Sequence, residues 1–177
     1  MADYTRPELI VPRLGGTDPA GIIKELSERL YAYESIGDRL AFYDAAVNHE
    51  FLSSSALPAG VAIPHARSDR ISRLTLVVGR TGNPVVWGGK GSWLVEHVFL
   101  IAVPSTDALE HLALLSGIAG LIRRPALLAR LRAAADAREM FELLKENSVG
   151  NWNRTPCEDT RPTGGEDAVV ARFDLKS

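Results

Sequence analysis

Cysteine is nearly absent from this sequence, since Cys157 is the only one in 177 residues. A single thiol cannot close a disulfide within the chain and cannot build a metal cluster of thiolates. Because disulfides are typical of oxidising compartments, the composition favours a reducing one. Neither a disulfide framework nor a thiolate-bound metal is expected.

An excess of charge of one sign is also lacking, as are long apolar runs. The 20 Lys and Arg residues nearly balance the 22 Asp and Glu residues, which leaves a net charge of -2. No global basic field therefore attracts nucleic acid or an acidic membrane surface. No segment approaches the ~20 apolar residues of a membrane helix, and the first residues do not form a secretory signal. We expect a cytoplasmic protein with no nucleic-acid partner and no membrane insertion.

Two common catalytic motifs are missing as well. The sequence contains no nucleophile elbow of the form G-x-S-x-G and no P-loop. A metal-dependent hydrolase built on two histidines would need a third ligand, and neither His49 nor His97 lies in a promising context. His97 is flanked by apolar residues of a predicted strand, which indicates a structural role. We expect no metal and no cofactor.

The composition that is present is that of an average globular protein, 46% hydrophobic and 24% charged, and the length favours one domain. Periodicity and capping residues predict helices at residues 17–37, 38–50, 108–122, 124–135 and 136–146. Short apolar runs predict strands at residues 8–14, 61–63, 74–80, 85–87 and 95–104, with Pro12 at a sheet edge and residues 51–60 as a loop. The pattern predicts a single α/β domain with a mixed β-sheet flanked by helices, and a fully parallel doubly wound sheet is the alternative.

The composition changes near residue 148. Residues 1–147 form the predicted domain, and residues 148–177 are polar and rich in glycine and proline, as is typical of a tail. The tail ends in the alternating segment AVVARF at residues 168–173, which could add to a sheet edge. The tail is therefore a candidate contact for a partner or for a second copy of the chain in a homodimer.

Two histidines are the candidate functional residues. His65 follows the short strand in GVAIPHAR, at the kind of strand end where α/β folds place functional groups. His111 lies near the start of an otherwise apolar helix. Each also has a plain structural explanation, His65 as a loop residue and His111 as a core residue. If the two face one another across a cleft, they offer nucleophilic or acid–base chemistry, because a neutral imidazole is a good nucleophile.

Several segments together resemble a known family. They are GVAIPHAR at residues 60–67, NPVVWGGKGSWLVEHVFLIAVP at 83–104, EHLALLSGIAGLI at 110–122 and LLARLRAAADAREMFELL at 127–144. Over residues 9–146 the chain is similar to the IIA domains of the bacterial phosphoenolpyruvate-dependent phosphotransferase system. The resemblance is to the fructose/mannitol type, which includes the nitrogen-regulatory IIA proteins. It implies the mixed α/β fold of that family and leaves out the tail.

The resemblance implies a role for both histidines. His65 corresponds to the histidine that accepts a phosphoryl group from the small histidine-containing phosphocarrier protein. It then passes the group to a IIB domain or holds it as a regulatory mark. His111 corresponds to the second active-site histidine, which positions the phosphoryl group. Uptake and donation both need in-line access, and the neighbouring Pro64 limits the freedom of the acceptor ring.

The segment HEFLSSSALPAG departs from the family pattern. His49 stands in the place of an arginine, and Ser54 and Ser55 replace a Ser-Thr pair. Histidine is neither bidentate toward phosphate nor permanently charged, so Arg67 is the candidate for the missing cation. The resemblance therefore predicts phosphate contacts from Ser54, Ser55, Arg67 and His49.

Two functions follow from these observations. The first is a phosphohistidine carrier, a phosphotransferase component with His65 as acceptor. The second is a IIA-fold regulatory or binding module that is not phosphorylated and acts through protein–protein interaction. The altered segment before the histidine motif and the tail favour the second, whereas the paired histidine motifs favour the first.

Overall fold

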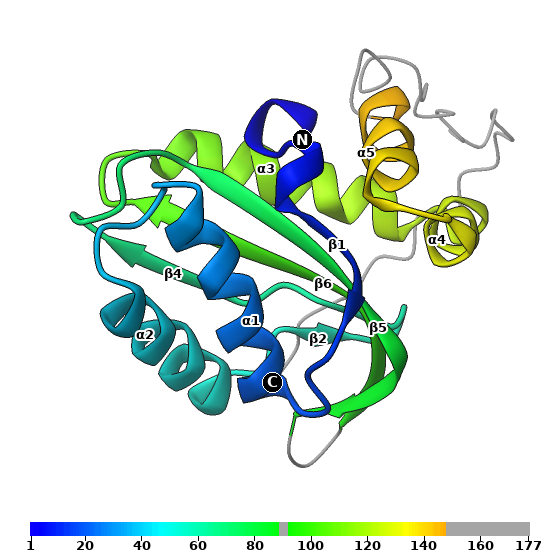
Figure 1. The fold of residues 1–177 in the computed structure, drawn as a ribbon, viewed down its shortest axis with the longest axis horizontal. Helices are drawn as coiled ribbons and strands as arrows, with labels where there is room; N and C mark the ends of the chain where they lie inside the picture. The colour runs from blue at the N-terminus through cyan, green and yellow to red at the C-terminus, as the bar shows by residue number, and fades with distance from the viewer. Residues whose placement is uncertain (89–91, 148–177) are drawn as a thin grey trace, which may run out of the picture.

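The computed structural model describes residues 1–88 and 92–147, where a β-sheet carries helices on both faces (Figure 1). Two short 3-10 helices, η1 (Ala2–Tyr4) and η2 (Pro7–Leu9), precede the first strand. The strands are β1 (Ile10–Leu14), β2 (Ala56–Leu57), β3 (Val61–Ala62), β4 (His65–Ser68), β5 (Thr75–Trp87) and β6 (Trp93–Pro104). The helices are α1 (Pro19–Ala32), α2 (Arg39–Leu52), α3 (Ala108–Ile122), α4 (Pro125–Ala133) and α5 (Ala137–Glu146).

The sheet is mixed, with the strand order β1-β5-β6-β3-β2 and β4 also paired to β6. β1 runs parallel to β5, and β3 and β4 run parallel to β6. β5 and β6 form an antiparallel hairpin, and β2 is antiparallel to β3. The predicted mixed sheet is confirmed and the fully parallel alternative is wrong. Pro12 lies in the edge strand β1, where a residue without an N–H is tolerated.

β3 and β4 form one interrupted line along β6. Val61 pairs with His97, and His65 continues in the same register opposite Ile101. Pro64 interrupts the line because it has no N–H to donate, although its carbonyl accepts from the N–H of Ile101 at 3.0 Å. His65 is therefore the first residue of a short strand, and the expectation of a loop position was wrong.

The strands predicted at residues 74–80 and 85–87 are one long strand, β5. The polar TGNP segment stays within it because β6 pairs on both sides of a register shift between Arg80 and Val85, as in a β-bulge. Residues 51–60, predicted as loop, contain the end of α2 and the short strand β2. The tail at residues 148–177, with its predicted strand and dimer contact, lies outside the described residues.

Aspartate caps begin three of the helices. Asp18, Asp38 and Asp136 each accept a hydrogen bond from the backbone N–H three residues further on, at 2.8 to 3.0 Å. Such a cap is worth ~1 kcal/mol and determines where the helix starts. Asp107 precedes α3 without a side-chain bond of this kind. The start of α2 is thus fixed locally, and its last turn reaches the sheet edge at β4.

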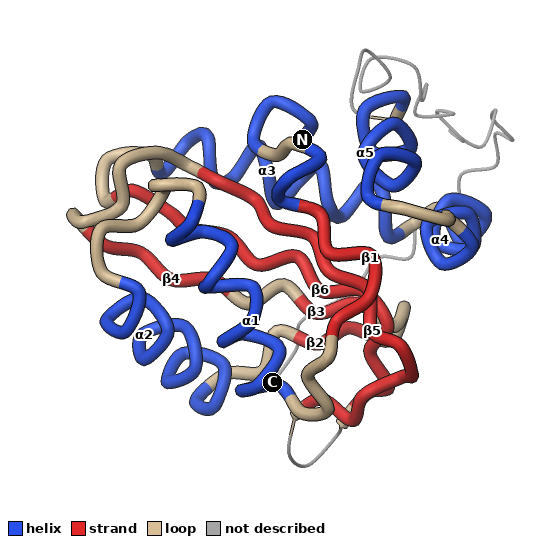
Figure 2. The backbone as a smooth tube through the Cα atoms, in the orientation of Figure 1, coloured by secondary structure: helices blue, strands red, loops and turns tan. Residues whose placement is uncertain are grey.

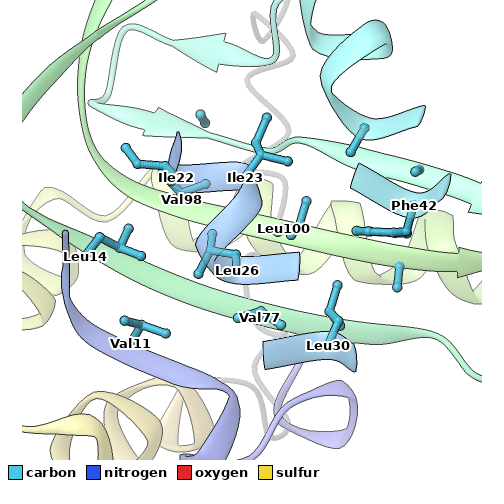
Figure 3. Close-up of a cluster of buried hydrophobic side chains, with 14 of the residues drawn as sticks. Val11, Leu14, Ile22, Ile23, Leu26, Leu30, Phe42, Val77, Val98 and Leu100 are labelled. Atoms are coloured by element: carbon cyan, nitrogen blue, oxygen red, sulfur yellow. The ribbon is translucent and has the colours of Figure 1, made fainter. Parts of the chain in front are cut away.

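Helices lie on both faces of the sheet (Figure 2), and an apolar core lies on each face. On one face, Leu26 of α1 and Phe42 of α2 share a cluster with Val77 of β5 (Figure 3). On the other face, Ile118 of α3 shares a cluster with Phe99 of β6 and with residues of α4 and α5. Full burial of side chains of this size contributes roughly 1.5–3 kcal/mol each. The first residue of β4, His65, lies beside His49 of α2 and His111 of α3.

The described part of the chain has no single helix that is long and apolar enough to cross a membrane. α3 and α4 meet the length and composition criteria only when taken together, and the chain bends by 89° between them. Both helices contribute buried side chains to the second core.

Candidate functional site

Three histidines from three elements meet at the edge of the sheet. His65 is the first residue of β4, His49 lies in the last turn of α2, and His111 is near the start of α3. The ring centroids of His49 and His65 are 4.4 Å apart, and those of His65 and His111 are 5.4 Å apart. No group of three or more His, Cys, Asp or Glu side chains in residues 1–88 and 92–147 is arranged to hold a metal ion. The structure thus brings the two predicted histidines together and places His49 beside them.

The imidazole of His65 has one nitrogen engaged and one free to react. Its Nδ1 lies 3.2 Å from the carbonyl oxygen of Ile63. A carbonyl only accepts, so Nδ1 carries the proton and the lone pair is on Nε2. Burial lowers the pKa of His65, and the charge of Arg67 acts in the same direction. The ring is therefore neutral at neutral pH, with a nucleophilic Nε2.

His111 presents the opposite tautomer. Arg67 Nη2 lies 3.5 Å from His111 Nδ1, and because a guanidinium only donates, Nδ1 accepts and Nε2 carries the proton. His111 is 8% exposed, and its Nε2 has no hydrogen-bond partner among the described residues. Burial lowers the pKa of His111, and His65 and Arg67 lower it further. A neutral ring with an unpaired N–H thus lies 5.4 Å from the ring of His65, measured between centroids.

A buried carboxylate holds the segment that precedes the histidine motif. Glu50 accepts hydrogen bonds from the Ser55 N–H at 2.7 Å, the Ser55 hydroxyl at 2.5 Å and the Trp87 indole at 2.8 Å. The Ser55 oxygen in turn accepts from the N–H of Ile63 at 3.0 Å. This chain of bonds reaches the residue whose carbonyl orients His65, so Glu50 acts as a positioning residue.

Sequence reasoning missed Glu50 and the backbone carbonyl of Ile63. The segment HEFLSSSALPAG drew attention to His49, whereas the adjacent Glu50 was left unassigned. A glutamate at the end of a predicted helix is compatible with an ordinary solvated helix end, and glutamate is rarely buried. Its burial depends on Trp87, which lies 37 residues further along the chain.

A cavity of about 600 Å³ borders this segment on the side of α1. Glu50, Ser54 and Gly88 line it together with the start of α1. Ser54 is exposed, and its oxygen would lie 3.0 Å from a Cβ placed on Gly88, which has a φ of +93°. Glycine therefore lets the end of β5 approach Ser54 closely.

His97 lies apart from the cluster. It occupies β6 opposite Arg80 of β5 and is 1% exposed. Burial lowers the pKa of His97 to about 4, and the positive charges of Arg132 and Arg80 act in the same direction. Its Nε2 has no hydrogen-bond partner among the described residues. The predicted structural role of His97 fits this position within the sheet.

Comparison with known proteins places the chain among phosphotransferase components. Residues 3–147 match the family "Phosphoenolpyruvate-dependent sugar phosphotransferase system, EIIA 2". A nitrogen regulatory protein of Bradyrhizobium diazoefficiens is 27% identical over 144 residues, which cover 81% of this chain and 94% of that protein. The 2-O-alpha-mannosyl-D-glycerate-specific EIIABC component of Escherichia coli is 27% identical over 151 residues, which cover 80% of this chain and 23% of that protein.

Solved structures show the same fold. The crystal structure of nitrogen regulatory protein IIA-Ntr from Neisseria meningitidis has a TM-score of 0.74 at 25% identity, covering 81% of this chain and 97% of that one. Enzyme IIAMTL of Escherichia coli, in its complex with phosphorylated enzyme IIBMTL, has a TM-score of 0.68 at 18% identity, covering 78% of this chain and 95% of that one. With the family matched over residues 3–147, the chain belongs to the EIIA type 2 family of the phosphoenolpyruvate-dependent sugar phosphotransferase system.

Proposed function

We propose that the chain is a phosphohistidine carrier, with the phosphoryl group carried on Nε2 of His65. The observation that supports this most directly is the contact of His65 Nδ1 with the Ile63 carbonyl at 3.2 Å, because it leaves the lone pair on Nε2. The lowered pKa of His65 keeps that nitrogen free of a proton at neutral pH. A carrier needs this state before each round of uptake.

The proposed step exchanges one N–P bond for another. The bond between phosphorus and the imidazole of the donor breaks, and its electron pair returns to the donor nitrogen. Nε2 of His65 supplies the electron pair of the new bond, while Nδ1 keeps its proton against the Ile63 carbonyl. Donation to the next protein is the same exchange with this chain as the donor.

The neighbouring side chains have distinct proposed roles. His111 donates its unused Nε2–H to a phosphoryl oxygen, and Arg67 supplies a permanent positive charge. The exposed hydroxyl of Ser54 and the imidazole of His49 contact the phosphoryl group from the α2 side. The Ser55 hydroxyl donates a hydrogen bond to the Glu50 carboxylate at 2.5 Å. We therefore assign Ser55 chiefly to holding the segment between α2 and β3.

The proposed partners follow from the family and from the surface near the histidines. The donor is a histidine-containing phosphocarrier protein, and the acceptor is a IIB domain or a regulated target protein. Enzyme IIAMTL forms a complex with a phosphorylated IIB enzyme, and nitrogen regulatory proteins are among the relatives of this chain. Large apolar side chains are exposed at the end of α2 and the start of α3: Phe51, Leu52, Leu109 and Leu112. They flank the histidines and offer an apolar rim for such partners.

The alternative is a IIA-fold binding module that acts by protein–protein interaction without being phosphorylated. The exposed rim favours it as well, since Phe51 is 90% exposed and Leu52 84% exposed beside the cavity. In that case the affinity for a target would not depend on phosphorylation of His65. The two functions therefore differ in whether phosphate is ever acquired.

Intact mass distinguishes them. The chain is incubated with phosphoenolpyruvate, the first phosphotransfer enzyme and the histidine phosphocarrier protein, beside a IIA domain of known activity. We expect a gain of one phosphoryl group that is acid-labile and absent from His65→Ala. His97→Leu, which removes a histidine outside the cluster, is the matched control and retains the label. An unlabelled wild-type chain beside a labelled reference domain would favour the binding module.

A further inference from the structure

The charge of a phosphoryl group on His65 exceeds the permanent charge around it. A phosphoryl group on a side chain carries about −1.5 to −2 charges near pH 7. Among the described residues assigned here to the phosphoryl site, Arg67 is the one with a permanent positive charge. Its guanidinium is also shared with the Nδ1 of His111 at 3.5 Å. One cation leaves part of the phosphoryl charge to be compensated by another group.

His49 is placed to provide that compensation. Its ring centroid is 4.4 Å from that of His65, closer than the ring of His111 at 5.4 Å. It lies in the last turn of α2, where the carbonyl end of the helix dipole stabilises a cation. The side chain of His49 is exposed, so it exchanges protons directly with solvent. Position, helix end and solvent access all favour a protonated state once a negative group arrives.

The charged groups around His49 come from four elements. Glu50 follows His49 near the end of α2, His65 faces His49 from β4, and Arg67 of β4 contacts His111 of α3. Asp18 at the start of α1 borders the cavity that Glu50 also lines. The carboxylate of Glu50 is already engaged by three donors, and Arg67 is itself a cation, with its guanidinium against His111.

We propose that phosphorylation of His65 is coupled to uptake of a proton by His49, whose imidazolium then compensates the phosphoryl charge. This inference rests on the proposed carrier function. The N–P bond moves from the donor to Nε2 of His65, and the added proton comes from solvent. An opposite charge within ~4–6 Å favours the charged form of an imidazole, which is the physical basis of the coupling. The phosphorylated state is thereby favoured as the pH falls.

The sign and limit of the effect follow from linkage. When the phosphorylated state binds one more proton than the free state, the transfer equilibrium shifts toward it by at most tenfold for each pH unit lowered. An arginine at this position would stay charged and a glutamine neutral over the same range. The transfer equilibrium of the wild-type chain should therefore match that of an arginine variant at low pH and that of a glutamine variant at high pH.

The test is the phosphorylation equilibrium between the chain and the phosphorylated histidine phosphocarrier protein, measured by intact mass between about pH 6 and pH 8.5. Wild type, His49→Arg, His49→Gln and Asn48→Arg are compared in the same mixtures, so the pH dependence of the donor cancels in their ratios. Asn48 is exposed and adjacent, so Asn48→Arg controls for general surface charge. Thermal unfolding checks that each variant is folded.

The expected result is a wild-type equilibrium close to that of His49→Arg near pH 6 and several-fold lower near pH 8.5, where it meets His49→Gln. Asn48→Arg keeps the wild-type pH dependence. A wild type that parallels His49→Gln, or His49→Arg, at every pH would overturn the proton coupling while leaving the carrier function intact. Absence of label on wild type and all variants, beside a labelled reference IIA domain, would instead reject the carrier function.

Discussion

Two histidines on neighbouring strands of one sheet have opposite surroundings. His97 is in β6 between two strands, and His65 is in β4, paired to β6 opposite Ile101, four residues beyond His97. At 3.3 Å per residue the two positions are about 13 Å apart along the strands. His97 is buried between β5 and β3, where the charges of Arg80 and Arg132 act on it, whereas His65 faces two other imidazoles at an edge.

The difference shows that position in the sheet decides what an imidazole can do. Burial lowers the pKa of both residues, so both are neutral at pH 7. At the interior position this neutrality serves packing, because no described group pairs with the free Nε2 of His97. At the edge, where His65 is half-buried, the same neutrality suits the nucleophilic role that we propose for Nε2. Burial lowers the pKa of both rings, and the two histidines differ in whether another protein can approach the ring.

The largest expected effect concerns the interior histidine and acid stability. The pKa of His97 is lowered from 6.5 to about 4 on folding, so its contribution is complete above pH 6.5 and is lost as the pH falls toward 4. The loss amounts to up to about 3 kcal/mol of unfolding free energy. Urea unfolding of wild type and His97→Leu between pH 7.5 and 4 should show a shallower acid limb in the variant. Equal slopes in the two proteins would mean that His97 takes up its proton in the folded protein as readily as in the unfolded chain.

The second effect concerns the rate of phosphoryl transfer and the part that His111 has in it. His111→Ala removes the N–H donor that we assign to the phosphoryl oxygen, and loss of such a donor slows a reaction by about 100-fold or more. The rate of phosphoryl transfer measured by rapid quench should fall by this order, whereas His97→Leu stays within about twofold. His111→Gln, which keeps an amide donor, should recover part of the rate. If His111→Ala and His97→Leu are equally affected, the two histidines do not differ in the way proposed.

The third effect tests what holds the edge site in place. Glu50→Gln keeps the shape but turns an acceptor for the Ser55 hydroxyl into an amide, which leaves a buried mismatch. The expected cost is about 1–3 kcal/mol in urea unfolding, together with slower labelling of His65. Glu142→Gln is the control, because Glu142 pairs with Lys145 at a solvent-exposed position and should cost below about 0.5 kcal/mol. Labelling that slows as much in the control would argue against a positioning role.

The smallest effect is a shift in two pKa values. The charge of Arg67 lowers the pKa of both His65 and His111, so Arg67→Gln should raise both. The pKa of His97 should stay where it is, since Arg80 and Arg132 act on it. An NMR titration of the imidazole protons measures the three values in one sample. If Arg67→Gln shifts the pKa of His97 as much as that of His65, the charge of Arg67 does not act selectively on the histidines at the sheet edge.

Local patterns were sufficient for much of the fold. Aspartate caps located the starts of α1, α2 and α5, and the proline of β1 identified an edge strand. The predicted strand boundaries were wrong where pairing with β6 extended a strand through residues whose composition is typical of a turn or loop. The TGNP segment was expected to end a strand, but its neighbours Arg80 and Val85 both pair with β6 and carry β5 through it. His65 was expected in a loop and instead begins β4, because β6 offers it the continuation of the register of β3.

The sequence by itself determined the class of fold, the family resemblance and the candidate histidines His65 and His111. Caps, periodicity and short motifs are local in the chain, so they can be recognised without coordinates. Only the tertiary structure decided which nitrogen of His65 is free, that His49 touches its ring, and that Glu50 is buried under Trp87. These facts depend on contacts between residues far apart in sequence, whose geometry is set by packing α2 and α3 against the same sheet edge.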